Sequence, residues 1–426
     1  MNDKLNFWQS TALVTGNMIG SGIFLMPASL ALYGGIGLLG WLFSSIGAIM
    51  LAIIFGYLSK YVSNVDGGPY AYTRAKLGDF PAFWVAWGYW VSIWSTNAAI
   101  TVALIGYLAV FFPILNESPT VAITTGLFFI WLMTWINSRP IRTVGAIQLI
   151  TVILKITPIF LIGFVGIFYV QWDNFPMANT SGVSNWSAIT TTTMLTLFAF
   201  LGMESATIPS KSIEDADTTI QRATITGTII TVLVYLLSSA AIMGLIPPQT
   251  LANSSAPFAD AAALIWGDTA KYLVAGGAVI STIGALNGWL LIQGQIPMAA
   301  AQDKLFPKIF KKTNKFGAPA IGIILSSILV SVLMMTKYSE SLVEAFTFMM
   351  TLSTLSVITP YIFSIASFSL FIKNENVKTR IPKIILALLA FCFLIWIIIG
   401  CGAEVVFLGF ILLMLGIPFY VGISKS

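Results

Sequence analysis

Long apolar segments recur along the whole chain and are separated by short polar segments. Each is about 20 residues or longer, the length that a helix needs to cross a hydrocarbon core about 30 Å thick. The pattern predicts an all-α polytopic membrane protein with a single transmembrane domain over residues 1–426. Twelve spans are expected, at about residues 8–33, 36–59, 81–112, 119–138, 146–171, 189–210, 222–246, 269–302, 319–336, 342–372, 383–400 and 403–423.

Composition and charge support this prediction, since 57% of the residues are hydrophobic and only 9% are charged. With the N-terminus in the cytoplasm, 18 of the 21 basic residues fall on that side, against Lys271 and Lys337 outside and Lys155 within a span. An excess of basic residues marks the cytoplasmic side. We therefore expect an integral protein of the plasma (bacterial inner) membrane, in contact with membrane lipid and with both termini cytoplasmic. The net charge of +5 then needs no nucleic-acid partner.

Two spans share a spacing of glycine and proline. Gly20 and Pro27 are seven residues apart in the first span, and Gly202 and Pro209 are seven apart in the sixth. A displacement of five spans would invert the second unit, which suggests two inverted five-helix repeats that each begin with an interrupted helix. Chance coincidence is the alternative. The two units and the extra C-terminal helices would cover about residues 8–171, 189–372 and 383–423.

The run from Gly20 through Ser21 to Gly22 is unusual inside a membrane helix. Each glycine costs about 1 kcal/mol relative to alanine in a helix interior, and freed backbone groups are tolerated only against protein or a watery cavity. At a break, N–H groups attract a carboxylate and C=O groups attract an ammonium group. Two facing breaks would therefore recognise a zwitterion, whereas close packing of small residues is the other interpretation.

Two ionisable side chains lie well inside spans, Glu204 and Lys155. A charge at the centre of a membrane helix costs about 2.5–3.5 kcal/mol, so each is a candidate functional residue. Each also has an interpretation without a functional role. Glu204 could make a structural hydrogen bond, and the amine of Lys155 could reach the membrane surface.

Polar and aromatic residues in three other spans could add to a binding site, although single aromatic residues more often serve packing. They are Tyr89, Ser92, Trp94, Asn97, Asn287, Trp289, Ser353 and Tyr361. The chain has no histidine and only two cysteines. We therefore expect no metal and no cofactor. We also expect no enzyme activity, because the spans contain no paired carboxylates and no nucleophile motif.

Several motifs resemble those of the amino acid–polyamine–organocation (APC) superfamily, in order and over nearly the whole chain. They include "GNMIGSGIFLMPASLALYGG", "DGGPYAYTRAKLG", "FAFLGMESA" and "LANSSAPFADAA". The chain is most similar to bacterial basic amino acid/polyamine antiporters of the arginine–agmatine type. This resemblance implies twelve helices in a five-plus-five inverted repeat with two further helices, and alternating access to a midplane site for small amino acid or amine substrates. Related exchangers are often dimers, which makes a homodimer an expectation.

The resemblance also implies roles for individual residues. Substrate would bind at Met18, Ser21, Gly22, Asn97, Ile100, Phe198, Leu201, Trp289 and Ser353. Gating residues would be Tyr70, Tyr89, Phe198, Glu204 and Tyr361, and proton coupling would involve Glu204 and Lys155.

Three departures from the arginine–agmatine pattern bear on function. Phe198 replaces a tryptophan gate, and Ile93 and Ile100 replace a cysteine and a methionine. Lys155 replaces a small apolar residue, as in proton-coupled permeases of the superfamily. Exchange of an amino acid with an amine and proton-coupled uptake through Lys155 therefore both remain open.

Overall fold

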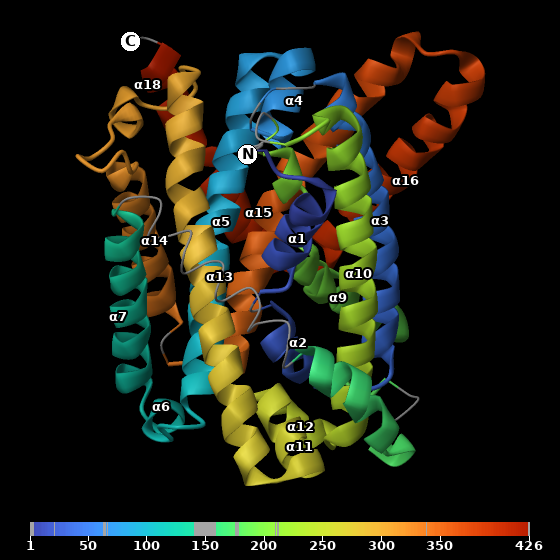
Figure 1. Cartoon of the computed structure of the whole chain (residues 1–426), viewed down its shortest axis with the longest axis vertical. Helices are drawn as coiled ribbons and strands as arrows, with labels where there is room; N and C mark the ends of the chain where they lie inside the picture. Colours follow the sequence, from blue (N-terminus) through green and yellow to red (C-terminus); the bar gives the residue numbers. More distant parts are fainter. Residues whose placement is uncertain are drawn as a thin grey trace.

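The computed structural model describes residues 4–20, 22–62, 65, 67–139, 159–174, 179–208, 210, 213–337 and 339–424. Within these ranges every regular element is a helix, apart from a parallel bridge between Leu5 and Ile213. The long helices lie side by side in one bundle, with short helices at its two ends (Figure 1). The first half contains α1 (Phe7–Met18), α2 (Gly22–Ala31), α3 (Ile36–Tyr61), α4 (Pro69–Leu77), α5 (Asp79–Leu108), α6 (Ile114–Glu117), α7 (Pro119–Asn137), the helix Ile159–Tyr169 with its last turn η1 (Ile167–Tyr169), and η2 (Trp172–Asn174). The second half contains α9 (Asn185–Leu197), η3 (Phe198–Phe200), η4 (Ser205–Thr207), α10 (Ala216–Leu245), α11 (Pro248–Ala252), α12 (Pro257–Trp266), α13 (Asp268–Gln302), η6 (Lys308–Lys311), α14 (Ala320–Thr336), α15 (Leu342–Phe371), η7 (Ile372–Asn374), α16 (Val377–Gly400), α17 (Ala403–Met414) and α18 (Gly416–Ser424).

The apolar helices agree in place with the predicted spans. In the described part of the chain, nine helices are long and apolar enough to cross a membrane, and α1 with α2 forms a further span with a 41° bend. Two shorter apolar helices, α14 with 17 residues and Ile159–Tyr169, lie within the spans expected at 319–336 and 146–171. The prediction of an all-helical, multi-pass membrane protein is therefore confirmed.

Local sequence explains where several helices begin. The side chain of Asn6 accepts a hydrogen bond from the backbone of Gln9, and the side chain of Gln9 accepts one from the backbone of Asn6, both at 3.0 Å. Ser341 and Glu344 form the same reciprocal capping box at the start of α15. Such boxes satisfy N–H groups that have no partner within the helix. They fix the first residues of α1 and α15, two helices that reach the centre of the bundle.

The centre of the bundle is built around α5. In the most apolar window of α5, 94% of the residues are buried, against 11% for the last span, Ala403–Ile423. α13 and α15 lie alongside α5 (Figure 1). Both termini lie toward the end of the bundle where α4 lies, here called the N-terminal end, and α11 and α12 lie at the opposite end (Figure 1). Side chains on α5, α13 and α15 therefore face the interior at the depth where α1 and α9 are interrupted.

Candidate functional site

Two interrupted helices meet at the centre of the bundle. One break separates α1 from α2, and the other follows α9 through η3 and η4. A Cβ atom added at Gly22 would lie 3.3 Å from the Cα atom of Ala199, and one at Gly202 would lie 3.3 Å from the backbone carbon of Asn17. Gly202 also has a φ of +99°, a conformation that side-chain-bearing residues rarely adopt. Glycine at both breaks thus permits backbone to approach backbone.

A tyrosine hydroxyl joins the two breaks. The Oη atom of Tyr235, on α10, lies 2.5 Å from the carbonyl oxygen of Met18 and 3.1 Å from that of Ala199. Tyr235 is completely buried. The Met18 carbonyl, which was predicted to receive the substrate amine, therefore already accepts this hydrogen bond and another from the backbone N–H of Gly20 at 2.7 Å. Tyr235 could not be singled out from the sequence, because its partners are backbone atoms of other helices.

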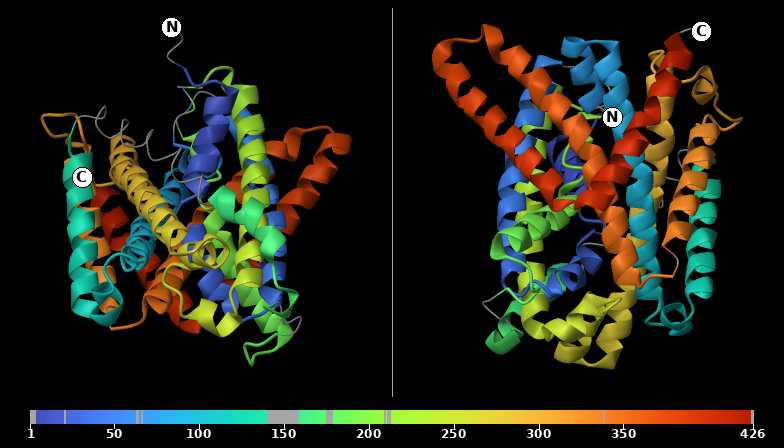
Figure 2. Two further views of the ribbon diagram at one scale, coloured as in Figure 1. Left: turned by 60° about the horizontal axis from the view of Figure 1, so that its bottom comes forward. Right: turned by 180° about the vertical axis from the view of Figure 1, so that it is seen from behind.

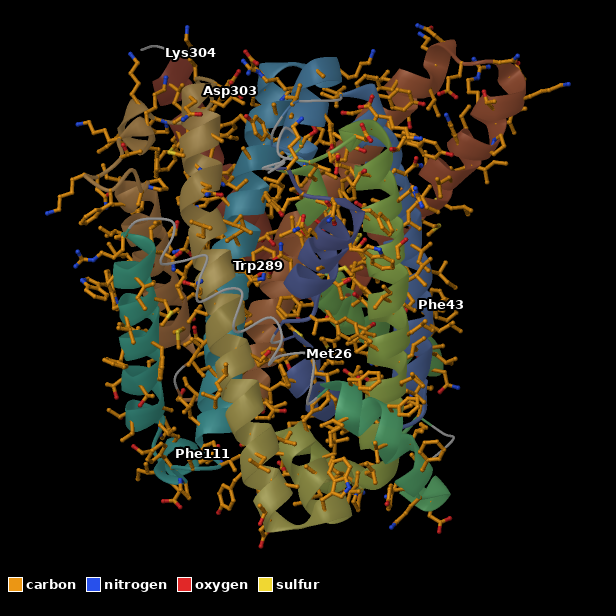
Figure 3. All side chains as sticks on the ribbon, viewed as in Figure 1. Met26, Phe43, Phe111, Trp289, Asp303 and Lys304 are labelled. Carbon is orange, nitrogen blue, oxygen red and sulfur yellow. The ribbon has the colours of Figure 1, made fainter. Side chains whose placement is uncertain are left out.

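A small cavity of about 20 Å³ lies between the breaks. That volume is enough for one water molecule but not for an amino acid. Its lining residues are Asn17, Met18, Gly20, Gly22, Thr96, Ile100, Phe198, Ala199, Leu201 and Trp289. Figure 3 shows Trp289 about midway along the bundle. Six of the nine residues predicted to bind substrate thus line one cavity. A seventh, Ser21, lies outside the described residues, as do Lys155 and Pro209.

Two predicted substrate residues, Asn97 and Ser353, are buried but do not line this cavity. The side-chain amide of Asn97 donates to Oε1 of Gln293 at 2.7 Å. The Ser353 hydroxyl lies 2.7 Å from the hydroxyl of Thr96 and 3.1 Å from that of Ser92. In this conformation Ser353 contacts the lining residue Thr96, whereas Asn97 contacts Gln293, which does not line the cavity.

Gln293 and Thr96 were not singled out from the sequence. Gln293 follows Trp289 by four residues on α13, so both side chains lie on the same side of that helix. The position of this amide one helical turn from the indole ring of Trp289 is the signal that could have identified Gln293. The Gln293 amide also donates to the hydroxyl of Ser327 at 3.0 Å, which extends the polar network to α14.

Glu204 and two tyrosines form a buried cluster next to the second break. Glu204 is completely buried, and its two carboxylate oxygens accept hydrogen bonds from the hydroxyls of Tyr89 at 2.6 Å and Tyr361 at 2.8 Å. The structure therefore brings together three residues that were predicted as a gating group. Because a buried carboxylate is stabilised by such donors, protonation or loss of a donor would change how α5 and α15 are held to the segment between η3 and η4.

A wider recess of about 470 Å³ opens at the N-terminal end of the bundle, lined in part by Tyr70, Ile208, Gln295 and Asp303. The Tyr70 hydroxyl donates to the Asp303 carboxylate, which Figure 3 places at this end. Along the chain, Glu204 lies between Leu201, which lines the central cavity, and Ile208, which lines this recess.

Arg74 extends the contact between α4 and α13. One guanidinium nitrogen lies 3.0 Å from the Asp303 carboxylate, and Nε lies 2.8 Å from Asp79. The hydrogen bond to Asp79 and the nearby charge of Asp303 raise the pKa of Arg74 above its usual value. Arg74 therefore stays positively charged, and it links α4 to the end of α13.

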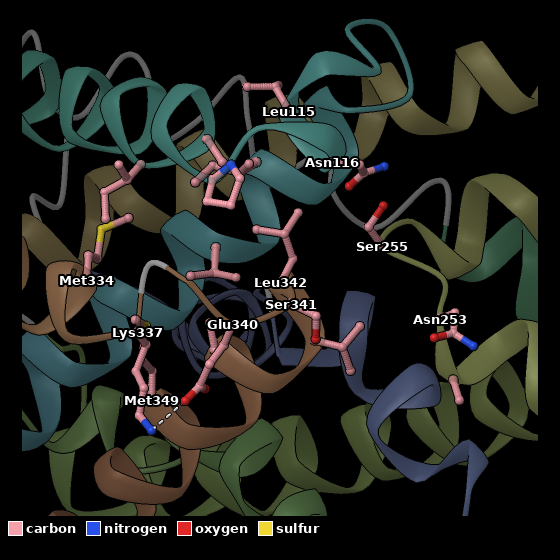
Figure 4. A pocket seen from close by; sticks show the side chains of 18 residues that line it. Leu115, Asn116, Asn253, Ser255, Met334, Lys337, Glu340, Ser341, Leu342 and Met349 are labelled. Atoms are coloured by element: carbon pink, nitrogen blue, oxygen red, sulfur yellow. Dashed lines mark hydrogen bonds and ion pairs between the residues drawn. The ribbon is translucent and has the colours of Figure 1, made fainter.

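A separate pocket of about 300 Å³ lies toward the opposite end, where α6, α7 and α15 meet. Figure 4 shows its lining, which includes Asn116, Asn253 and Ser341, together with an ion pair between Lys337 and Glu340 at 2.8 Å. The two charged groups neutralise each other, and the pocket contains neither helix break. It is a weaker candidate for recognition of an amino acid than the smaller central cavity.

The family of the chain follows from comparison with known proteins. A model of the amino acid permease family matches residues 5–419. The chain belongs to the amino acid permease family. The predicted membership of the APC superfamily is thereby confirmed.

Three curated relatives of this permease are similar over nearly their whole length. The arginine/ornithine antiporter of Pseudomonas aeruginosa is 30% identical, with 100% of the permease and 94% of the relative covered. The cadaverine/lysine antiporter of Escherichia coli is 31% identical, with coverages of 92% and 89%. The putrescine transporter of Haemophilus influenzae is 30% identical, with coverages of 98% and 97%. The permease is thus a transporter, similar to antiporters of amino acids and amines.

The described residues of the permease offer no group of three or more histidine, cysteine, aspartate or glutamate side chains that could hold a metal ion. The chemistry available at the site is hydrogen bonding, helix-end electrostatics and contact with aromatic faces.

Proposed function

We propose that this permease is a secondary active antiporter that exchanges a basic amino acid for its decarboxylated amine, or for another amino acid, by alternating access. The observation that carries the proposal is the wall of the central cavity, which combines two helix breaks with the indole ring of Trp289. Helix ends can hold the α-carboxylate and α-amine of a zwitterion. A side-chain cation over the indole would gain about 0.5–2 kcal/mol without a fixed counter-charge. None of the described lining residues is a carboxylate.

The named functions of the relatives support the substrate class. Two of them are antiporters of basic amino acids, arginine with ornithine and lysine with cadaverine. Ser21 and Gly22 would then offer groups to the substrate carboxylate, as the resemblance implies. The carbonyl of Leu201 would take the amine, together with the carbonyls of Met18 and Phe198 once their present donors withdraw.

The gating roles are part of the same proposal. Phe198 would cover the substrate, and Glu204 with Tyr89 and Tyr361 would separate the site from the N-terminal end. Tyr70 would close that end through Asp303. Ile100 would shape the pocket for the substrate side chain, while Asn97 and Ser353 would act on the distal cation after rearrangement.

The proposed architecture has twelve membrane helices in a single domain, with two inverted five-helix repeats at about residues 8–171 and 189–372 and two further helices at about 383–423. Support comes from the facing breaks near the start of each repeat. Both termini lie toward one end of the bundle, which agrees with a cytoplasmic placement of both. A homodimer remains an expectation from relatives.

The second candidate function is proton-coupled uptake, which the intramembrane Lys155 favours. Burial disfavours a charged amine, so Lys155 could release a proton during the cycle. A buried acid, Glu204, lies on the proposed path as a second group that could carry the proton.

Uptake into proteoliposomes tests the proposal. Labelled L-arginine, L-lysine and L-ornithine would each be offered to vesicles that are empty or preloaded with amino acid or with agmatine, cadaverine or putrescine, with and without a pH gradient. Exchange predicts uptake only into preloaded vesicles, indifferent to the gradient. Concentrative uptake into empty vesicles that is driven by inward protons and lost in Lys155→Ala would overturn exchange in favour of symport.

A further inference from the structure

A groove of about 260 Å³ lies between α15 and α16, far along the chain from the substrate-site residues of α1 and α9. Its lining is almost entirely apolar and consists of Ile362, Ile365, Ala366, Ser369, Ile384, Ala387, Leu388 and Phe391. Three of the lining side chains, Ala366, Ser369 and Ala387, are small and leave room between the two helices.

The groove faces the surroundings of the bundle. Leu388 is 60% exposed and Phe391 is 40% exposed. Figure 2 shows the hairpin of α15 and α16, coloured orange to red, with its connecting end standing away from the other helices. In a membrane, the molecules next to this groove are lipids.

Two cations lie beyond one end of the groove, Arg380 on α16 and Lys373 in the short η7 that follows α15. Arg380 precedes the groove residue Ile384 by four residues on α16, and Lys373 follows Ser369 by four residues. On α16 this spacing places Arg380 and Ile384 on one helix face, about 6 Å apart along the axis. Both cations therefore flank the same end of the groove, the end at the helical connection.

The Arg380 guanidinium has donor capacity to spare. One Nη atom donates to the Lys373 carbonyl at 3.0 Å, while the buried Nε atom has no acceptor among the described residues. The nearby acid, Glu375, is engaged elsewhere, because Lys383 lies 2.7 Å from its carboxylate and the Tyr61 hydroxyl also donates to it. The end of the groove thus carries positive charge that no neighbouring carboxylate in the described structure neutralises.

We propose that this groove is a binding site for an anionic phospholipid. An acyl chain fills the apolar groove, and the headgroup phosphate accepts hydrogen bonds from Arg380 and Lys373. An apolar channel that ends in two cations matches an amphiphile with an anionic head. A free phosphate would leave the groove unfilled, and a second copy of the chain would have to bury both cations.

Thermal melting of the purified, delipidated full-length protein in detergent tests the site, with dioleoyl phosphatidylglycerol, dioleoyl phosphatidylcholine or inorganic phosphate added. We expect phosphatidylglycerol to raise the melting temperature and the other two to leave it unchanged. Arg380→Gln and Lys373→Gln should each weaken the apparent affinity for phosphatidylglycerol about fivefold. Lys378→Gln is the matched control, since it removes a charge from the same segment about 200° around the helix from Arg380.

Two variants test the groove itself. Ala366→Phe fills the groove, and Leu388→Gln makes it polar; either should abolish the effect of phosphatidylglycerol with both cations intact. The proposal is wrong if phosphatidylcholine or phosphate stabilises the protein equally, or if Lys378→Gln weakens the effect as much as Arg380→Gln. It is also wrong if the groove variants dissociate a dimer while phosphatidylglycerol still stabilises the monomer. The readout does not depend on transport, so it stands apart from the proposed function.

Discussion

One methyl group added at Gly22 should weaken substrate binding, whereas the same group added at Gly20 should not. Both glycines line the central cavity and belong to the same break. A Cβ atom at Gly22 would lie 3.3 Å from Ala199 Cα and from two ring carbons of Phe198. A Cβ atom at Gly20 would meet its nearest neighbour, the Cβ of Ala285, at 3.6 Å, an ordinary contact.

The magnitude follows from how little room the cavity has. The Phe198 ring must move by a few tenths of an ångström to accept the new methyl group, and the cavity that it lines is only about 20 Å³. Overpacking of this kind costs about 1–3 kcal/mol. If this strain remains in the larger conformation that binds substrate, with the Phe198 ring pushed toward the substrate, that cost appears as a dissociation constant raised about 5- to 150-fold.

Binding of radiolabelled L-arginine, L-lysine and L-ornithine to purified Gly22→Ala and Gly20→Ala provides the measurement, with melting curves recorded on the same samples. We expect Gly20→Ala to match the unmodified protein within about twofold and Gly22→Ala to bind within the weaker range given above. Equal affinities for the two variants, or weaker binding by Gly20→Ala, would refute the placement of Phe198 and Gly22 around the substrate.

Three further predictions concern single side chains. Trp289→Leu should weaken a basic amino acid at least about fivefold and a neutral one of similar size much less, measured by competition binding. Tyr89→Phe removes the 2.6 Å hydrogen bond to Glu204 and should reduce the free energy of unfolding by about 1.5–3 kcal/mol, seen in denaturation, with slower exchange in vesicles. The pKa of Glu375 is held below its usual value of 4.5, first by the hydrogen bond from Lys383. The stabilisation by ionised Glu375 should therefore be complete at neutral pH and fade as the pH falls below about 4. The melting temperatures of the unmodified protein and Glu375→Gln should converge in this acidic range. A constant difference down to pH 3 would contradict this.

Much of the fold could be predicted because the membrane imposes one requirement on every span. A helix must satisfy its own backbone and present about 20 apolar residues, so hydropathy alone locates α3, α5 and α15 within a few residues. The predicted span at 36–59, for example, corresponds to a helix at Ile36–Tyr61. Where glycine breaks the pattern, as between α1 and α2, the sequence also indicates the interruption.

The site was predictable where a residue is out of place in its own segment. Glu204 stands out because a carboxylate in an apolar span is costly, and the structure shows the two hydroxyls that stabilise it. Tyr235 and Gln293 are ordinary residues for their helices, and their importance comes from partners on other helices. Only the packing of α10 against the breaks reveals Tyr235, whereas the position of Gln293 one turn after Trp289 is a signal in the sequence.

The small volume of the central cavity has a consequence for affinity measurements. In the described conformation an amino acid cannot occupy the space between Phe198 and Trp289, so binding requires a conformation in which this space is larger. The measured affinity is then the intrinsic affinity multiplied by the fraction of molecules in that expanded conformation. Substitutions that touch no substrate atom, but shift the population toward the expanded form, would therefore tighten the measured binding of every substrate by the same factor.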